Sequence, residues 1–163
     1  MKILLMSDTH GYLDDVMKKY IKTVDEVWHA GDIGNIELCD EIKEMKSLKA
    51  VYGNIDDTVI RKEYPEHLRF TIEGVDVWMT HIGGYPGNYF YDIRQEIKAN
   101  PPKLFISGHS HILKVMNDEK LSLLHMNPGA VGKKGFHKKR TMLRFVVENS
   151  VIKDLELIDL GNR

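Results

Sequence analysis

The first third of the chain alternates short apolar runs with segments of helical periodicity. The apolar runs predict buried strands over residues 2–6, 26–30 and 49–52. Between these strands, apolar side chains recur every three or four residues, which predicts helices over 12–23 and 36–45. A strand–turn–helix unit that repeats in this way is typical of a sheet whose parallel strands are covered by helices.

The rest of the chain is richer in strands. Its middle is predicted to contain a hairpin with strands over 68–72 and 75–79. A loop over 83–87, a helix over 89–99 and a further strand over 103–107 are predicted to follow. Four strands of a mostly antiparallel sheet are then expected over residues 113–116, 121–126, 142–147 and 151–158. Because the sequence shows no internal repeat, low-complexity segment or linker, we expect a single α/β domain over 1–163, with two facing sheets and helices outside.

Polar side chains follow five of the predicted strands, at the point where each strand ends. They are Asp8, His10, Asp32, Asn54, His81, His109 and His111. In open α/β sheets, sites form at the carboxyl ends of the strands. We therefore expect these side chains to converge, although they lie far apart in the sequence.

The expected cluster has the composition of a metal site. Two carboxylates, four imidazoles and one amide, without a thiolate, suit borderline or hard divalent ions such as Mn, Fe, Zn, Ni or Co. Such a set does not match a closed structural zinc site. It holds too many ligands for one ion and enough for two ions with open positions. Asp32 is the expected bridge, because one carboxylate can bind two cations through its two oxygens.

Several histidines and one asparagine have a second interpretation. Asn54 follows a glycine and could cap a turn. The turn that carries His109 and His111 could hold two solvated histidines. His29 could orient a metal ligand or be only a half-buried strand residue, whereas His125 is expected to pack within a strand.

Two further segments lie outside the expected cluster. The basic segment 133–140, KKGFHKKR, is expected to form a solvated hairpin tip. The alternative is that Arg140 or one of the lysines steers an anionic substrate toward the metals. The aromatic side chains of Tyr85 and of residues 89–91 are expected mainly to pack, although one of them could stack on a base or an aryl group.

Composition and charge narrow the functional classes. The 163 residues carry 23 Lys and Arg against 24 Asp and Glu, so a nucleic-acid polymer that binds through a large basic field is not an expected partner. No apolar run approaches the roughly 20 residues of a membrane helix, so no membrane partner is expected either. The single cysteine, Cys39, excludes an internal disulfide and fits a reducing compartment, which favours a cytoplasmic location. A homo-oligomer is compatible with the sequence.

The polar motifs also resemble those of a known family. The ordered set SDTHG, GDIGN, GNID, MTHIGG and GHSH is similar to the motifs of the calcineurin-like metallophosphoesterases, in particular of their small bacterial and archaeal phosphodiesterase branch. The segment NPGAVG, over 127–132, is similar to a further part of that branch. The resemblance implies an α/β fold of four layers, an α-β-β-α sandwich with two facing mixed β-sheets.

The resemblance further implies two divalent metal ions and a role for each candidate. Asp8, His10 and His111 would hold the first ion, Asn54, His81 and His109 the second, and Asp32 would bridge them. Manganese is the expected metal, with nickel, iron, zinc, cobalt or magnesium as alternatives. Asp32, Asn54 and His81 are assigned to catalysis as well as to metal binding.

The implied activity is hydrolysis of small phosphate esters, diesters above all, by a hydroxide that two metals activate. One position departs from the family pattern. Many members have GNHD, whose histidine assists the leaving group, and here Ile55 takes its place. We therefore expect diesters with good leaving groups to be cleaved far better than alkyl monoesters. The alternative is a protein-binding scaffold similar to the retromer subunit of this fold; a nuclease is disfavoured by the short, near-neutral chain.

Overall fold

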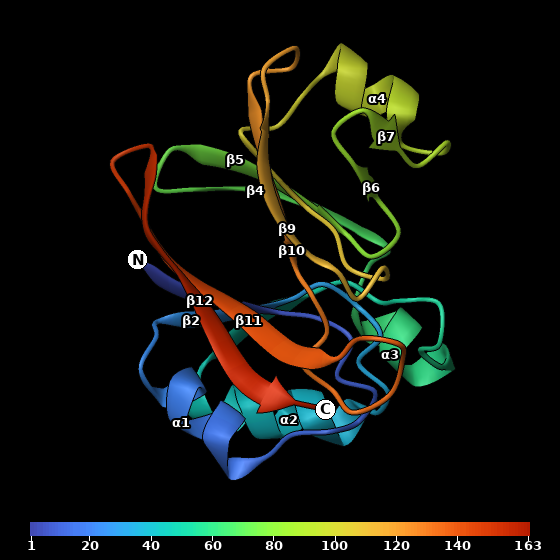
Figure 1. Ribbon diagram of the computed structural model, residues 1–163, viewed down its shortest axis with the longest axis vertical. Helices are drawn as coiled ribbons and strands as arrows, with labels where there is room; N and C mark the ends of the chain where they lie inside the picture. The colour runs from blue at the N-terminus through green and yellow to red at the C-terminus, as the bar shows by residue number, and fades with distance from the viewer.

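The computed structural model describes residues 1–163, which form two five-stranded mixed sheets that face each other (Figure 1). The first sheet has the strand order β12-β11-β1-β2-β3, with β1 (Lys2–Met6), β2 (Glu26–His29), β3 (Ser47–Ala50), β11 (Lys139–Glu148) and β12 (Val151–Asn162). The second sheet has the order β4-β5-β8-β10-β9, with β4 (His67–Ile72), β5 (Val75–Thr80), β8 (Leu104–Ile106), β9 (Leu113–Asp118) and β10 (Leu123–Pro128).

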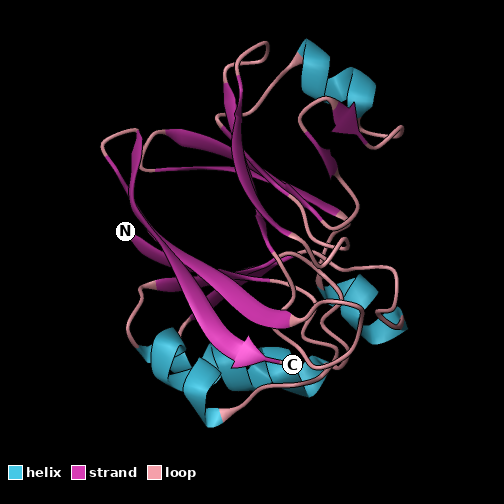
Figure 2. Ribbon diagram, viewed as in Figure 1, coloured by secondary structure: helices cyan, strands magenta, loops and turns pink.

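The helices lie on the outside of the two sheets (Figure 2). They are α1 (Asp15–Lys22), α2 (Ile36–Met45), α3 (Thr58–Glu63) and α4 (Arg94–Ala99). The first sheet is covered by α1 and α2, whereas α4 lies beyond the second sheet (Figure 1). This arrangement confirms the predicted α-β-β-α sandwich with two facing mixed sheets. No helix is long and apolar enough to cross a membrane.

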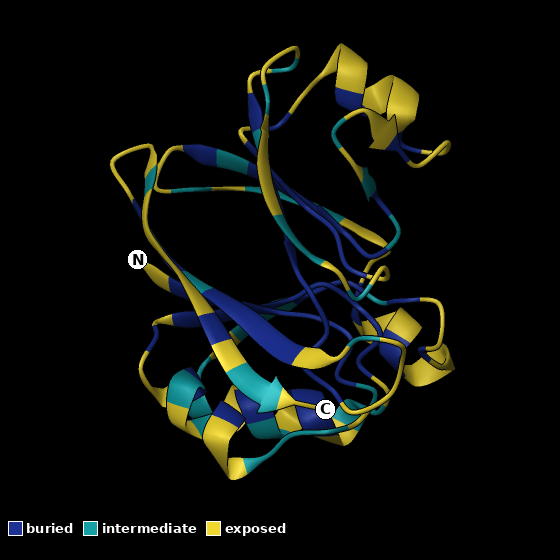
Figure 3. Cartoon of the chain, viewed as in Figure 1, coloured by how far each residue is buried: buried dark blue, intermediate teal, exposed yellow.

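Side chains that alternate between the two faces of the central strands form three apolar layers. On β1, Ile3 and Leu5 point between the two sheets, where they meet Trp28. The intervening residues Leu4 and Met6 face the helices instead. A third, smaller cluster lies between the second sheet and α4. Because both faces of β1 are covered, its sequence after Lys2 reads as one apolar run rather than as an alternating strand, and these apolar residues are buried (Figure 3).

The direction of the strands decides where the functional loops meet. In the first sheet β1, β2 and β3 are parallel, and in the second β5, β8 and β10 are parallel. Strands β11, β4 and β9 pair antiparallel with β1, β5 and β10. The carboxyl ends of the central strands therefore lie at one edge of each sheet, and the loops that follow β1, β2, β3, β5 and β8 carry all seven candidate residues.

Several predicted boundaries differ from the structure. Helix α1 begins at Asp15 instead of residue 12, because the Asp14 side chain accepts a hydrogen bond from the Met17 amide at 2.9 Å and caps the helix there. The six-residue helix α3 was not predicted, because Ile60 is its single buried residue and no periodicity is visible.

The second half of the chain holds two larger differences. The predicted loop over 83–87 contains the first strand of a small hairpin, β6 (Gly84–Tyr85) and β7 (Asn88–Tyr89), and the predicted helix over 89–99 is reduced to α4. The four C-terminal strands do not form one sheet. Strands β9 and β10 belong to the second sheet, whereas β11 and β12 belong to the first. The chain changes sheets after Pro128, where Gly129 has a positive φ that a glycine adopts without strain.

Candidate metal centre

The loops after the central strands are tied together by backbone hydrogen bonds. The Asp8 amide donates to the Gly31 carbonyl at 3.0 Å, which joins the loops after β1 and β2. The Gly108 amide donates to the His81 carbonyl at 2.9 Å, which joins the loops after β5 and β8. A third bond crosses between the sheets, because the His109 amide donates to Asp8 Oδ2 at 3.3 Å. The facing sheets therefore present their loops as one surface.

Half of the ten non-glycine residues with a positive φ lie at this surface. Five of the seven candidates have a positive φ, although none is a glycine: Asp8, His10, Asp32, His109 and His111. The left-handed region is uncommon for such residues, and a strained backbone that persists in a folded protein is concentrated at functional sites. Here the strain turns side chains from successive loops toward a common centre.

Six candidate side chains gather in two clusters. The ligand atoms of Asp8, His10 and His111 lie within 4.8 Å of one another, and so do those of Asp32, His81 and His109. The clusters adjoin, since His10 Nε2 lies 3.7 Å from Asp32 Oδ2 and His81 Nε2 lies 4.0 Å from Asp8 Oδ1. Both carboxylates are buried.

The seventh candidate, Asn54, lies on the rim of the second cluster. The residues on either side of it contact Asp32: the Ile55 amide donates to Asp32 Oδ1 at 3.1 Å, and Gly53 packs against that carboxylate. Asn54 also lines a cavity together with His81. The loop after β3 therefore reaches the candidate centre, with the Asn54 side chain on its exposed side.

Hydrogen bonding fixes the tautomer of His81. Its Nδ1 lies 2.7 Å from the Ala30 carbonyl oxygen, which can only accept, so Nδ1 carries the proton. In the neutral ring Nε2 is then a lone pair, and it faces Asp32 Oδ1 at 3.2 Å. Two acceptors this close need a cation between them, either a proton or a metal ion. Burial opposes protonation of His81, but Asp32 and Asp8 outweigh it and raise its pKa.

Several ligand atoms lack a hydrogen-bond partner, which favours a metal ion over a proton. Asp8 Oδ1, His10 Nε2 and His81 Nε2 are buried and have no hydrogen-bond partner in the protein. An unpartnered buried acceptor costs about 1–3 kcal/mol, so a native fold retains several together only where something else binds them. Carboxylate oxygens and imidazole nitrogens of this kind fit divalent ions that accept mixed O and N ligands.

The Asp32 carboxyl is held in its ionised form. Burial alone would raise its pKa, but the close imidazole of His81, followed by the Ile55 amide, outweighs burial and lowers the pKa of Asp32. Asp32 and His81 interact so closely that their protonation is coupled. The lowered pKa of Asp32 and the raised pKa of His81 therefore belong to the pair. An ionised carboxylate with both oxygens near imidazoles is suited to bind two cations.

Close backbone approaches require glycine next to the cluster. A Cβ on Gly53 would overlap Oδ1 and the backbone amide of Asp32. A Cβ on Gly31 would meet the ring of His81, and Gly31 also has a positive φ of 94°. Both glycines therefore permit the loops after β2, β3 and β5 to close on one another.

Asp56 is a supporting residue that the sequence did not single out. This buried carboxylate accepts from three backbone amides: Gly53 at 2.7 Å, Gly34 at 2.8 Å and Ile33 at 3.1 Å. It thereby fixes the loop after β2 to the loop after β3. Arg61 adds to this support, since its guanidinium donates to the carbonyl oxygens of Gly53, Asn54 and Asp56.

Two histidines outside the clusters also support the loops. His29 is buried and links β2 to the loop after β1, since its Nε2 lies 2.9 Å from Thr9 Oγ1 and its Nδ1 accepts from the Gly31 amide at 3.2 Å. Burial lowers the pKa of His29 to about 4, so the ring is neutral. His137 contacts His111, with 3.1 Å between their Nδ1 atoms.

The basic segment 133–140 is exposed apart from His137 and Arg140, as expected for a solvated tip. Arg140 is buried, donates to the Val131 carbonyl at 2.8 Å and pairs with Asp14 at 2.8 Å. Substrate steering by Arg140 is therefore wrong, because its charge is neutralised inside the protein. The segment also delivers His137 to the cluster around His111, and substrate steering by one of its lysines stays a prediction.

Comparison with known proteins agrees with the site and the fold. The profile of the calcineurin-like phosphoesterase superfamily domain matches residues 1–150. A probable metallophosphoesterase of Methanocaldococcus jannaschii is 30% identical over 137 residues, which cover 80% of this chain and 68% of that protein.

Two solved structures share the fold. One, described as a novel archaeal phosphodiesterase, has a TM-score of 0.76 and 24% identity, and the match covers 98% of this chain and 100% of the other. The other is the Zn²⁺ complex of Vps29 from Entamoeba histolytica, with a TM-score of 0.74 and 16% identity over 98% of this chain and 99% of that one. The sequence matches, which span most of the chain, show that this protein belongs to the calcineurin-like phosphoesterase superfamily and is a metallophosphoesterase.

Proposed function

We propose that the protein is a phosphodiesterase that uses two divalent metal ions, manganese first among them, to hydrolyse small phosphate diesters. The proposal is carried by one observation: two buried carboxylates and four imidazoles form two adjoining clusters, within each of which the ligand atoms lie within 4.8 Å of one another, and three of these atoms are buried and unpartnered. Two ions bound there would polarise the phosphoryl oxygens and lower the pKa of the attacking water.

The residues have distinct roles in this proposal. Asp8, His10 and His111 hold one ion; Asn54, His81 and His109 hold the other. Asp32 lies between the clusters and holds both ions. The positions of its oxygens support this role, because Oδ2 faces His10 at 3.7 Å and Oδ1 faces His81 at 3.2 Å. Asp32, Asn54 and His81 also position the phosphoryl group: Asn54 and His81 line the cavity beside the second cluster, and Asp32 Oδ1 lies 3.2 Å from His81 Nε2.

The side chain at Ile55 sets a preference among substrates. It is 45% exposed and stands beside Asp32 without an ionisable group. Proton donation to a departing alkoxide is worth roughly 10²–10⁴-fold in rate when a side chain supplies it. We therefore propose that nitrophenyl diesters, whose leaving group needs no proton, are hydrolysed far faster than alkyl monoesters. Similar rates on both classes would refute this preference.

The direct test measures hydrolysis of bis-p-nitrophenyl phosphate by metal-stripped protein, before and after manganese is added. Activity should depend on manganese, and Asp32→Ala should lose at least about 10²-fold in kcat because neither ion is then held correctly. Asp159→Ala is the matched control, since Asp159 is an exposed aspartate on β12. Its rate should equal that of the wild type.

The scaffold alternative makes a different forecast for the same experiment. A protein-binding scaffold of this fold would take up divalent ions, as the Vps29 structure with Zn²⁺ does, but would not hydrolyse any ester. Calorimetric titration of the metal-stripped protein separates the cases. Uptake of about two ions with turnover supports the enzyme, uptake without turnover supports the scaffold, and absence of uptake removes the enzyme.

A further inference from the structure

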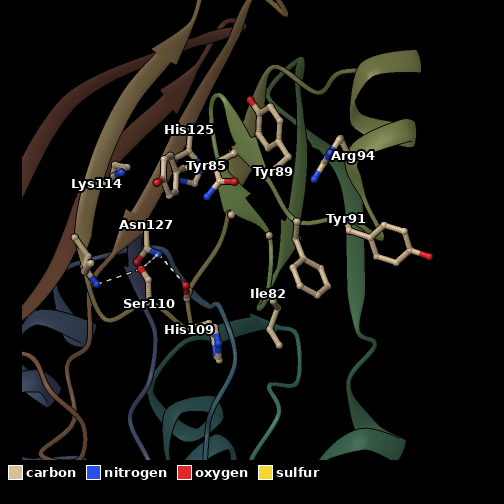
Figure 4. Close-up of a pocket in the computed structure, with 16 residues that line it drawn as sticks. Ile82, Tyr85, Tyr89, Tyr91, Arg94, His109, Ser110, Lys114, His125 and Asn127 are labelled. Carbon is tan, nitrogen blue, oxygen red and sulfur yellow. Dashed lines mark hydrogen bonds between the residues drawn. The ribbon is translucent and has the colours of Figure 1, made fainter.

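A cavity of about 450 Å³ opens beside the candidate metal centre, between the β6–β7 hairpin and the second sheet (Figure 4). In that view Lys114 lies on one side, Tyr91 and Arg94 lie on the other, and His109 lies at the lower end. Because His109 belongs both to this wall and to the cluster around Asp32, the cavity continues directly from the place where a phosphoryl group would be held.

Exposed apolar and aromatic side chains gather on this cavity. Tyr85, Phe90, Tyr91 and Ile112 line it and are 38%, 41%, 77% and 61% exposed. Large side chains left in water at one concave place are a mark of a ligand site. None of them is needed by the metal clusters, and the metal chemistry leaves them without a role.

One buried polar side chain on the cavity lacks any partner. His125, on β10, is 0% exposed, and neither of its ring nitrogens has a hydrogen-bond partner. Its ring lies against Phe105, with 5.7 Å between the centroids, and it belongs to the cavity wall. Burial, followed by the charge of Lys114, lowers the pKa of His125 to about 4. The neutral ring therefore keeps one donor and one acceptor unpaired at the cavity wall.

The cavity also carries positive charge that no carboxylate neutralises. Lys114 places its ammonium 3.4 Å from the centroid of the Tyr85 ring, and it has no acidic residue within ion-pair distance. Arg94 stands at the rim without an ion pair as well. An aromatic wall, a cation and an unpartnered imidazole are the groups that recognise a flat polar ring attached to an anion.

We propose that this cavity binds the aromatic ring of an ester substituent, either an aryl group or a nucleobase, while the phosphoryl group lies at the metal centre. The inference rests on the proposed function, because the metal centre is what anchors the phosphoryl end. A volume of about 450 Å³ is within the range of small-molecule sites and accommodates one such ring with its linker.

The test compares three phosphoryl compounds that share an anchor and differ in the attached group: methylphosphonate, phenylphosphonate and adenosine 5′-monophosphate. Their affinities for manganese-loaded protein are measured by calorimetry, so no turnover is required. We expect phenylphosphonate to bind about tenfold more tightly than methylphosphonate, because one aromatic ring is buried. Adenosine 5′-monophosphate should bind more tightly still if His125 contacts the base.

Variants locate the ring and distinguish the two sources. Tyr85→Ala and Lys114→Met should each reduce the tenfold higher affinity for phenylphosphonate to less than threefold. Tyr85 stands at an exposed position that the core does not need.

His125→Leu should remove the higher affinity for the nucleotide over phenylphosphonate and leave the higher affinity for the phenyl compound in place, which would assign the cavity to a nucleobase. If His125→Leu changes neither, the cavity takes a plain aryl group. Leu157→Ala, an exposed apolar residue on β12, is the control and should match the wild type.

The outcomes separate this inference from the proposed function. Equal affinities for the methyl and phenyl compounds would overturn the cavity assignment, and so would a phenyl advantage that survives both Tyr85→Ala and Lys114→Met. Ring-dependent binding in a protein that hydrolyses no ester would support the cavity and remove the catalytic proposal. If none of the three compounds binds the manganese-loaded protein, both proposals fall.

Discussion

The Nδ1 atoms of His111 and His137 lie 3.1 Å apart, and the direction of the hydrogen bond between them can be deduced. His137 Nε2 lies 2.9 Å from the carbonyl oxygen of Gly132, so it must carry a proton. Burial first, and the neighbouring His111 as well, lower the pKa of His137, so its ring is neutral and its Nδ1 accepts. His111 therefore donates through Nδ1.

This direction leaves the other nitrogen of His111 ready for a cation. Its Nε2 is then a lone pair, and it lies 3.1 Å from Asp8 Oδ1. The same relationship holds between His81 and Asp32 in the second cluster, where the Ala30 carbonyl fixes the tautomer. In each cluster a group outside the proposed ligand set accepts a hydrogen bond from Nδ1 of an imidazole, which leaves the Nε2 lone pair of the neutral ring directed at a buried carboxylate.

The first expectation is that His137 tunes the affinity of the site that contains His111. Hydrogen-bond partners of metal-bound histidines typically contribute 10–100-fold in affinity. We expect His137→Ala to weaken one of two manganese-binding steps by roughly that factor and to leave the other step unchanged, as measured by competition titration with a chelator.

Two further variants show whether the hydrogen bond is responsible. His137→Asn offers an Oδ1 acceptor in place of Nδ1 and should restore part of the affinity. Phe136→Ala removes a neighbouring side chain that is fully exposed and should have no effect. A loss that is the same in both binding steps would indicate a general structural defect instead of a contact with His111.

The second expectation concerns the backbone contact between Gly53 and Asp32. A Cβ at residue 53 overlaps the Asp32 carboxylate and its amide, so one of the two loops must move. We expect Gly53→Ala to cost about 1–3 kcal/mol of unfolding free energy and to weaken metal binding at least tenfold.

Gly161→Ala is the comparison for that variant. Gly161 has a positive φ of 85°, but no atom lies within 4 Å of the position that its Cβ would take, so its cost of about 1 kcal/mol comes from the backbone alone. Its metal affinity should stay at the wild-type value. Unchanged metal binding in Gly53→Ala would show that the loops tolerate the displacement.

The third expectation is that Asp56 stabilises the loops without touching a metal. Removing its carboxylate leaves the amides of Gly53, Gly34 and Ile33 without their acceptor. We expect Asp56→Ala to cost about 3–5 kcal/mol in urea unfolding, since each lost charge-assisted bond contributes roughly 1.5–3 kcal/mol and losses are not fully additive.

Asp56→Asn should lie between the wild type and the alanine variant, because one acceptor oxygen remains. Asp40→Ala, on the exposed face of α2, should change stability by less than about 0.5 kcal/mol. A small effect of Asp56→Ala would mean that water replaces the carboxylate in the loop.

The fold could be predicted because its strong signals are local. The run from Lys2 to Met6 is apolar after its first residue, since both faces of β1 are covered, and a polar break marks its end. The same signal repeats in β2 and β8, so the positions of the candidate ligands followed from strand ends alone. Convergence of those ends needed only the parallel order of the central strands.

The supporting residues could not be predicted, because their contacts join distant parts of the chain. His137 reaches back 26 residues to His111, and Arg140 pairs with Asp14 across 126 residues. The charge of the lysines around Arg140 indicates a solvated segment. Only the fold brings an acidic partner to Arg140. The change of sheets after Pro128 is likewise invisible in the pattern of β9 to β12, because antiparallel strands look alike in either sheet.

The last expectation follows from the buried neutral His125. Its pKa is about 4 in the folded protein against about 6.5 in the unfolded chain. Between these values the unfolded state binds more protons, so stability that is fully present above pH 6.5 is lost as the pH falls toward 4. From pH 7 to pH 5 the protonation of this group alone should lower the unfolding free energy by about 2 kcal/mol.

We expect metal-free wild-type protein to lose about that much more unfolding free energy over this interval than His125→Leu. The carboxylates titrate in the same way in both proteins. His67→Leu is the matched control, because His67 lies at an exposed position on β4, and it should keep the wild-type dependence on pH. Identical pH profiles for the wild type and His125→Leu would show that the ring is protonated, or bound to water, inside the cavity.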